Sequence, residues 1–323
     1  MAKASFVIRR ILIILLVLLI ILIVFMFTAP ALEKVDETPV LNSERWMASL
    51  SDGRRLSQIV IPGTHDSATQ YVQLAFFSKC QALSIEDQLR AGFRYLDIRL
   101  GEDMKLKHGF TDCKSSNAFW AEPLRLDSVL YQVYAFLREN PTETVIFAVK
   151  QEHGSDSVEK FQTDLKYYID INPEMWLLTD TIPTLGQARG KIVLMRRYED
   201  KAGLGAQAGI PLLWEDQSGS DGARNTAASD NGYTLWVQDR YEYGTSQKWY
   251  AFRDGCAASK TGAEDISLNF LSTKGTLIYG HPYFYARELN RRLMAAETSH
   301  NWGWTIVDFG SAKLAEHIYS INR

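Results

Sequence analysis

Two of the six histidines follow short apolar stretches that predict buried strands. His65 and its neighbour Asp66 come just after residues 58–62, and His108 comes just after residues 104–107. If these strands belong to a parallel barrel, they end at one rim and both imidazoles lie at the same site. One imidazole can then take a proton from an attacking hydroxyl while the other gives a proton to a leaving oxygen, because unperturbed imidazole titrates near neutral pH. Such a pair suits in-line phosphoryl transfer.

Charged residues at the ends of other predicted strands could complete this site. Asp308 follows an apolar stretch and can hold one imidazole in its productive tautomer. Arg99 and Asp97, two residues apart, point to the same face of their strand, so the guanidinium could bind a phosphate through two hydrogen bonds. It would stabilise charge on the nonbridging oxygens, a role that a divalent cation fills in other phosphodiesterases. Lys150 and Glu152 share one face by the same spacing.

Each of these residues also has a structural explanation. A single histidine is more often structural, and Asp97 with Arg99 could form an ordinary ion pair at the rim. The functional interpretation depends on their convergence. Polar groups gathered from several strand ends are costly to assemble unless a polar ligand binds among them.

Apolar stretches that end on polar residues recur along the chain and alternate with helical segments. Helices are predicted over 84–92, where Ser84 caps the start and Gly92 ends it, and over 126–140, before Pro141. This alternation favours a single α/β domain built as a parallel barrel. An open doubly wound sheet is the alternative, although no glycine-rich nucleotide-binding turn follows any strand. The predicted strands cover 58–62, 93–100, 104–107, 144–149, 191–195, 234–237, 266–271 and 304–307.

The N-terminus carries an uninterrupted apolar segment that is long enough to cross a bilayer. Residues 11–28 contain no charge and follow Arg10, as expected of an N-terminal anchor with a cytoplasmic start. A cleaved signal peptide is the alternative, because residues 29–31 read Ala-Pro-Ala, although the apolar segment is longer than the usual secretory core. In both cases residues 31–323 form a domain outside the cytoplasm, either anchored by residues 1–30 or secreted.

The composition excludes some classes of partner. Lys and Arg total 35 against 38 Asp and Glu, so no overall basic surface indicates nucleic acid, and phosphate must be recognised locally. No repeat or linker indicates a second folded domain, and no obligate protein partner is inferred. Cys80 and Cys113 are the preferred disulfide pair for an oxidising compartment, whereas the alternative is that all three cysteines, with Cys256, are buried thiols. None has the spacing of a zinc site.

In combination these residues resemble the catalytic X domain of phosphatidylinositol-specific phospholipase C, and most closely its bacterial-type, single-domain, metal-independent branch. The resemblance extends over nearly all of the chain after the apolar segment. Any one motif alone is weak, and their combination is specific. The matching stretches are 61–67 (IPGTHDS), 88–99 (QLRAGFRYLDIR), 108–109 (HG), 136–145 (FLRENPTETV), 150–152 (KQE), 190–197 (GKIVLMRR), 237–241 (VQDRY), 268–270 (LNF) and 304–309 (WTIVDF).

The resemblance implies an irregular TIM barrel that cleaves phosphatidylinositol, or a glycosylated phosphatidylinositol anchor, to diacylglycerol and inositol 1,2-cyclic phosphate. It implies that His65, held by Asp308, is the base that acts on the inositol 2-hydroxyl. His108, aided by Asp66, would be the acid that serves the diacylglycerol oxygen. Arg99 would contact the phosphate.

The resemblance also implies which residues bind the sugar and whether a metal is needed. The calcium-dependent branch carries acidic ligands where this strand has Arg99, so neither a metal nor another cofactor is expected. A tyrosine ring would lie against one face of the inositol. The residues that match inositol-binding positions are Lys150, Glu152, one of Arg196 and Arg197, Asp239 and Tyr241.

The expected partners are an inositol phospholipid and the membrane surface. Phe76 and Phe77 fall where bacterial members carry a short helix that inserts into the membrane interface, and the alternative is that both are core residues. Lys79 beside them could meet anionic headgroups. An uncleaved anchor is not typical of the secreted relatives and would tether the site to the enzyme's own membrane. Residues 203–231 are expected to form a flexible loop at the rim.

Two other functions fit part of the pattern. Another barrel phosphodiesterase, of the glycerophosphodiester or sphingomyelinase D-like type, would share the paired histidines but normally needs metal-binding carboxylates. Arg99 argues against it. A non-catalytic membrane protein that binds inositol lipids would need only the pocket, so the complete set of acid, base and phosphate-binding residues disfavours this function.

Overall fold

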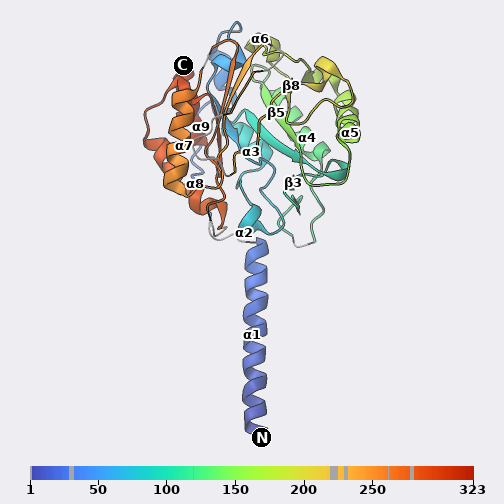
Figure 1. Cartoon of the computed structure of the whole chain (residues 1–323), viewed down its shortest axis with the longest axis vertical. Coiled ribbons are helices and arrows are strands. Elements are labelled where there is room, and N and C mark those ends of the chain that lie inside the picture. The colour runs from blue at the N-terminus through green and yellow to red at the C-terminus, as the bar shows by residue number, and fades with distance from the viewer. Residues whose placement is uncertain are drawn as a thin grey trace.

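The body of the protein is a curled, mostly parallel β-sheet with helices packed around its outside (Figure 1). The structure is a computed structural model that describes residues 2–28, 33–118, 120–218, 225–228, 232–260, 262–276 and 280–323. Its strands are β1 (Ile61–Thr64), β2 (Tyr95–Leu100), β3 (Lys107–His108), β4 (Thr111–Asp112), β5 (Val145–Gln151), β6 (Trp176–Leu177), β7 (Ile192–Arg196), β8 (Ile210–Pro211), β9 (Asn225–Ala228), β10 (Thr234–Gln238), β11 (Asp265–Phe270) and β12 (Trp304–Val307). The order across the main sheet is β6-β7-β5-β2-β1-β12-β11-β10-β9, and β8 pairs with β7.

The helices alternate with these strands. Two predicted helices are confirmed, because Ser84 caps α3 by accepting a hydrogen bond from the backbone N–H of Asp87, and α4 ends just before Pro141. Short 3-10 turns, among them η1 (Ser43–Ser49), η2 (Leu56–Gln58), η3 (Glu102–Met104) and η5 (Gly205–Ala208), join other elements. The α-helices are α1 (Ala2–Thr28), α2 (Ala75–Ser78), α3 (Ile85–Arg90), α4 (Leu126–Glu139), α5 (Val158–Ile171), α6 (Leu185–Ala188), α7 (Thr245–Ala258), α8 (Pro282–Ala295) and α9 (Ala312–Tyr319).

The sheet curls into a barrel that backbone hydrogen bonds do not fully close. Among the described residues, β9 pairs with β10 in the antiparallel sense, and no strand pairing joins β8 to β10. Side chains bridge this gap instead. The hydroxyl of Tyr233 donates to the carbonyl of Pro211, and Nε2 of Gln217 donates to the carbonyl of Val237 at 3.3 Å. The predicted irregular α/β barrel is therefore confirmed.

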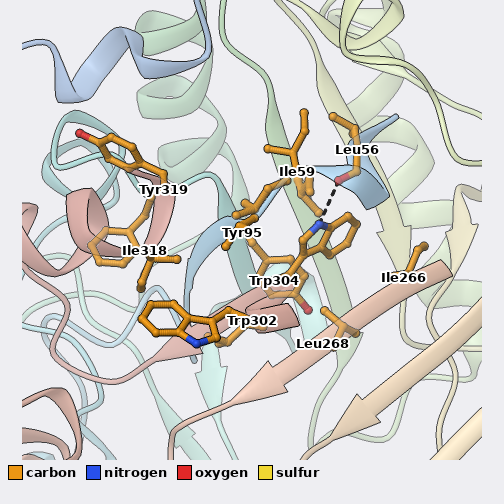
Figure 2. Packing of buried hydrophobic residues seen from close by; sticks show 14 of the residues in the cluster. Leu56, Ile59, Tyr95, Ile266, Leu268, Trp302, Trp304, Ile318 and Tyr319 are labelled. Atoms are coloured by element: carbon orange, nitrogen blue, oxygen red, sulfur yellow. Dashed lines mark hydrogen bonds between the residues drawn. The ribbon is translucent and has the colours of Figure 1, made fainter. Parts of the chain in front are cut away.

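Apolar side chains fill the end of the barrel at which the strands begin. Figure 2 shows this core around Trp304, the first residue of β12, whose indole N–H donates to the carbonyl of Leu56 at 3.2 Å. Tyr95, the first residue of β2, is fully buried, and its ring centroid lies 6.0 Å from that of Trp304. Because the strands start in this dry core, their polar residues are left for the opposite end.

Two predicted strands differ from the structure. Residues 56–58 form the 3-10 turn η2, so the first strand starts later than predicted. The strand predicted over 104–107 is confirmed only in part: Lys105 and Leu106 form isolated antiparallel bridges and Lys107 begins β3, but the chain reverses after β2, so His108 lies on the short β3–β4 hairpin outside the main sheet. Asp103 and Met104 make the reversal with positive φ angles of 54° each, a conformation that side chains rarely adopt.

The segment 203–231 is more ordered than a flexible loop in its first half. It contains η5 and the two residues of β8. Its later part forms β9, while residues 219–224 and 229–231 lie outside the described residues.

The helix α1 extends away from the barrel and leaves it beside α2 (Figure 1). Its residues Ser5–Phe27 are long and apolar enough to cross a membrane, with a mean hydropathy of 3.4, and none of the span is buried in the protein. A signal sequence would have the same length and composition. The helix meets the barrel at α2, where the ring centroid of Phe25 lies 5.6 Å from that of Phe76.

A buried ion pair fixes the N-terminal segment of the body to the barrel. The Arg94 guanidinium donates to Oε2 of Glu143 at 2.9 and 3.0 Å, and both side chains are fully buried. It also donates to the backbone carbonyls of Ser43 and Glu44 in η1 and of Leu89. One guanidinium therefore holds η1, the end of α3 and the strand β5 together.

We expect Arg94→Met to destabilise the fold strongly, because it leaves the Glu143 carboxylate buried without its cation. Breaking such a pair costs about 3–5 kcal/mol. The measurement is urea unfolding of the full chain in detergent micelles, followed by tryptophan fluorescence. Arg90→Met is the control, since Arg90 pairs with Glu86 and Glu139 at the surface and should cost at most about 1 kcal/mol. Equal losses in the two variants would contradict this assignment.

Candidate active site

A cavity of about 390 Å³ opens at the end of the barrel where the strands finish. It combines two histidines with cations and carboxylates, which makes it the candidate active site. A wider depression of about 1090 Å³, lined by residues 39–42 and the C-terminal residues, holds no histidine. The residues that line the candidate site are His65, Phe77, Cys80, Arg99, His108, Lys150, Glu152, Arg197, Trp214, Asp216, Asp239, Tyr241, Ser272, Thr273, Lys274, Pro282 and Asp308.

The hydrogen bonds of His65 define its tautomer. The residue follows β1 directly, and its Nδ1 lies 2.8 Å from Oδ1 of Asp308, which follows the neighbouring strand β12. Its Nε2 lies 2.7 Å from Nη2 of Arg99. Because a guanidinium nitrogen can only donate, Nε2 must be the acceptor and Nδ1 carries the proton that Asp308 accepts. His65 is therefore neutral, with the lone pair of Nε2 at the cavity.

Opposing effects set the pKa of His65. Burial lowers this pKa, but the Asp308 carboxylate raises it and Arg99 lowers it in turn. The net result is a pKa above the ordinary value of histidine. Asp308 thus makes Nε2 a stronger base, while Arg99 keeps it unprotonated until that cation is displaced.

The second histidine has its own carboxylate. Nδ1 of His108 lies 2.6 Å from Oδ2 of Asp66, which is almost fully buried. The ring centroids of His65 and His108 are 6.4 Å apart, so a group of phosphate size can lie between them. Asp66 adopts a φ of 45°, and a positive φ at a residue other than glycine is strain of the kind that active sites retain. The Asp66 carboxylate holds the His108 ring by its Nδ1 and leaves its Nε2 free of this contact.

The carboxylate of Asp97 accepts hydrogen bonds from both Arg99 and Arg197. Oδ2 accepts from Nη2 of Arg99 at 3.0 Å and from the backbone N–H of Asp66 at 3.1 Å, while Oδ1 accepts from Nη1 of Arg197 at 3.1 Å. Burial alone would raise the pKa of Asp97, but the two guanidinium groups lower it far below its usual range. Asp97 is therefore an anion under all physiological conditions. Nη1 of Arg99 also lies 3.9 Å from Oε1 of Glu152.

The far side of the cavity is lined by paired charges and aromatic rings. Lys150 and Glu152, at the end of β5, form an ion pair at 2.9 Å. The Arg197 guanidinium stacks over the Trp214 ring with 4.0 Å to the ring centroid, and its Nη2 lies 3.9 Å from Oδ2 of Asp239. The Tyr241 hydroxyl donates to Oδ1 of Asp216 at 2.7 Å. Donors, acceptors and aromatic faces thus surround one volume.

Three predicted site residues do not line this cavity: Asp66 is buried behind His108, and Arg196 and Phe76 have other partners. Arg196 is the last residue of β7 and Arg197 follows it. Because successive side chains of extended backbone point to opposite faces, Arg196 turns away from the cavity, and its Nη1 donates to the carbonyl of Tyr198 at 2.7 Å. Only Arg197 therefore occupies the position for which both arginines were candidates. Phe76 packs against the rings of Phe77, His281 and Phe284, whereas Phe77 lines the cavity and is about one-third exposed.

The preferred disulfide is absent, since Cys80, Cys113 and Cys256 are all free thiols. Sγ of Cys80 lies in the cavity, 3.7 Å from Nδ1 of His108, while Cys113 lies in the core beneath β2. Burial raises the pKa of the Cys80 thiol, so this group stays neutral. Together with His65 and Asp308, or with Asp66 and His108, it could hold a metal ion. The Arg99 cation beside both groups opposes such binding.

The sequence analysis missed six residues that line the cavity, Trp214, Asp216, Ser272, Thr273, Lys274 and Pro282, and the buried Lys248 that supports it. Trp214 and Asp216 lie in the 203–231 segment, which has no strand pattern to place them. Lys248 is fully buried on α7, where its Nζ donates to Oε1 of Gln238 at 3.0 Å and to the carbonyl of Arg240 at 2.6 Å. It thereby fixes the segment that carries Asp239 and Tyr241. Burial lowers the pKa of Lys248 to about 7.

Comparisons with known proteins agree with this geometry. The model of the family described as phosphatidylinositol-specific phospholipase C, X domain, matches residues 55–198. The chain is 28% identical over 304 residues to 1-phosphatidylinositol phosphodiesterase of Staphylococcus aureus (strain Newman), which spans 87% of this chain and 92% of that protein. It is 32% identical over 204 residues to 1-phosphatidylinositol phosphodiesterase of Listeria monocytogenes, across 56% of this chain and 61% of that protein.

Solved structures show the same architecture. A structure of phosphatidylinositol-specific phospholipase C from S. aureus superposes with a TM-score of 0.68 at 25% identity, covering 87% of this chain and 98% of that one. The enzyme from L. monocytogenes superposes with a TM-score of 0.65 at 22% identity over the same shares, which supports the fold. Over residues 55–198 and in its fold, the chain is thus similar to the phosphatidylinositol-specific phospholipase C X-domain family.

Proposed function

We propose that this protein is a phosphatidylinositol-specific phospholipase C that cleaves its substrate to diacylglycerol and inositol 1,2-cyclic phosphate. The observation that carries the proposal is the placement of Arg99 between two carboxylate-backed imidazoles. Its Nη2 lies 2.7 Å from Nε2 of His65, and its Nη1 lies 3.5 Å from the carboxylate that faces His108. A phosphate bound at this cation would have a base on one side and an acid on the other.

In the proposed reaction, Nε2 of His65 takes the proton of the inositol 2-hydroxyl, and that oxygen attacks the phosphorus. The bond between phosphorus and the diacylglycerol oxygen breaks as the protonated His108 gives its proton to that oxygen. One proton enters His65 and one leaves His108, so the charges balance. The products are the free diacylglycerol and a five-membered cyclic phosphodiester. Water can open this ring in a slower second step.

Arg99 must leave Nε2 of His65 before this nitrogen can accept a proton. The phosphate supports the exchange, because two anionic oxygens are better partners for a guanidinium than one imidazole nitrogen. The guanidinium then stabilises the charge that develops on the nonbridging oxygens. This is the work of a metal ion in calcium-dependent relatives, and we propose that the enzyme needs neither a metal nor another cofactor.

The inositol ring is proposed to lie on the far side of the cavity. Lys150 and Glu152 offer a donor and an acceptor to neighbouring hydroxyls, and so do Arg197 and Asp239. The Tyr241 ring would cover one face of the sugar. Nothing in this arrangement distinguishes a free phosphatidylinositol from a glycosylated anchor, since both present the same inositol phosphate.

The membrane is proposed as the second partner. The apolar helix α1 would remain as an anchor and place the barrel on the outer face of the membrane, with Arg9 and Arg10 on the cytoplasmic side. Cleavage of α1 would instead release a secreted enzyme. Phe77 at the mouth would contact the interface in both cases.

We expect His65→Ala and His108→Ala each to lower kcat by about 10²- to 10⁴-fold, because each removes one proton-transfer group. The assay follows release of the inositol product from a short-chain, water-soluble phosphatidylinositol. His153→Ala is the matched control, since His153 is exposed and lies outside the cavity. Near-normal turnover in either active-site variant would disprove the two-histidine mechanism.

The pH dependence should identify His65 as the base. Activity requires its neutral form, so kcat/KM rises with pH through the pKa of His65. Asp308 raises this pKa, and Asp308→Asn should therefore move the acid limb to lower pH as it slows the reaction. Arg99 lowers the same pKa, so Arg99→Met should move the limb to higher pH. An acid limb that stays in place in both variants would assign the base to another residue.

A further inference from the structure

A short segment between the apolar helix and the barrel is fixed to the rim of the active site. We name residues 33–36 the juxtamembrane strap. The Glu33 carboxylate is almost fully buried, with Oε2 2.5 Å from Nζ of Lys79 and Oε1 3.2 Å from Nε2 of His281. Lys79 follows α2, and His281 is the fully buried N-cap of α8. One acidic side chain thus joins the strap to the end of α2 and the start of α8, the two helices at the rim of the cavity.

Further contacts continue along the strap. The hydroxyl of Tyr283 donates to the carbonyl of Lys34 at 3.0 Å, and Val35 packs on the small core cluster that contains Tyr283 and Phe309. Asp36 pairs with Lys313 at 3.1 Å on the surface. Each of the four residues of the strap therefore has a partner on the barrel. A strap bound in this way acts as part of the body and not as a free linker.

The apolar helix also touches the rim directly. The ring centroid of Phe25 lies 5.6 Å from that of Phe76 on α2. Phe25 is two residues before the end of the membrane-spanning stretch Ser5–Phe27, which corresponds to about 3 Å along a helix axis. The rim helix α2 therefore meets α1 at the level where the bilayer core ends. Phe77 on α2 lines the active-site cavity, as does Pro282 at the start of α8.

We propose that α1 and the juxtamembrane strap hold the mouth of the active site against the membrane that contains α1, so that the enzyme cleaves lipids of its own leaflet and not those of a facing membrane. Glu33 follows Thr28 by five positions, so the chain between them spans at most about 18 Å. That reach is too short for the barrel to turn over and present its mouth to another bilayer. The lipid cleavage in this proposal rests on the proposed function. The orientation of the barrel toward its own membrane rests on the contacts of the juxtamembrane strap and α1.

The test compares two arrangements of purified full-length enzyme reconstituted in phosphatidylcholine vesicles. Phosphatidylinositol is placed either in the same vesicles as the enzyme or in separate vesicles. We expect cleavage in the shared vesicles to be at least about tenfold faster, because the anchor raises the local concentration of substrate. Inserting 20 Gly/Ser residues between Thr28 and Glu33 should raise the fraction cleaved in separate vesicles several-fold. Equal wild-type rates in the two arrangements would overturn the proposal.

The variant Glu33→Gln tests the strap itself. It keeps the shape of the side chain but removes the charge that faces Lys79 and His281, so cleavage in separate vesicles should rise relative to shared vesicles. Glu37→Gln is the matched control, since Glu37 is exposed on the same segment. All variants should cleave a water-soluble short-chain phosphatidylinositol at the wild-type rate. A vesicle preference that Glu33→Gln and the insertion both leave unchanged would contradict a role of the strap.

Hydrogen exchange separates this proposal from the proposed function because it needs no turnover. In lipid nanodiscs, amides of α2 should exchange faster in the Gly/Ser insertion and in Glu33→Gln than in the wild type or Glu37→Gln. If neither the wild type nor any variant cleaves the soluble substrate but the α2 amides exchange faster in the two altered chains, the proposed activity is wrong and the proposed orientation of the barrel is supported. Unchanged exchange in both altered chains, or a mature protein that lacks residues 1–30 by mass spectrometry, would overturn the orientation.

Discussion

The active site depends on one buried anion, the carboxylate of Asp97. It is fully buried and accepts hydrogen bonds from Arg99, Arg197 and the backbone of Asp66. Those three residues belong respectively to the phosphate, sugar and acid parts of the proposed mechanism. A carboxylate in a dry core must be compensated, and here the compensation fixes two guanidinium groups in directions that a ligand can use. The cation proposed to bind the phosphate is therefore built into the barrel.

The same network gives two histidines of similar chemistry different partners, as the proposed mechanism requires. Nε2 of His65 accepts from Nη2 of Arg99, whereas Nδ1 of His108 faces the carboxylate of Asp66 and, at 3.7 Å, Sγ of Cys80. Because Arg99 lies near both Asp66 and Asp97, removing any one of these charges alters both imidazoles. Effects of mutations within the network should therefore not add, as is usual for coupled polar groups.

Much of this site could be predicted from the sequence because parallel strands end at one rim. Arg99 and Asp308 follow from that rule together with the strand pattern. His108 was placed at the site for the wrong reason, since it lies on a hairpin whose reversal uses positive φ angles without glycine. Cys80 and Trp214 come from loops, whose positions depend on contacts distant in the sequence. The predicted disulfide between Cys80 and Cys113 was wrong for the same reason: the spacing of two cysteines in the sequence does not tell on which side of the fold each thiol lies.

Phosphorus NMR of the full-length enzyme acting on phosphatidylinositol in the presence of EDTA tests the central claim most directly. The signal of a five-membered cyclic phosphodiester should appear first and then convert slowly to inositol phosphate, with no calcium added. This outcome would support both the cyclising attack by the 2-hydroxyl and the replacement of a metal by Arg99. An acyclic product from the start, or a cyclic signal that appears only after calcium is restored, would contradict the account.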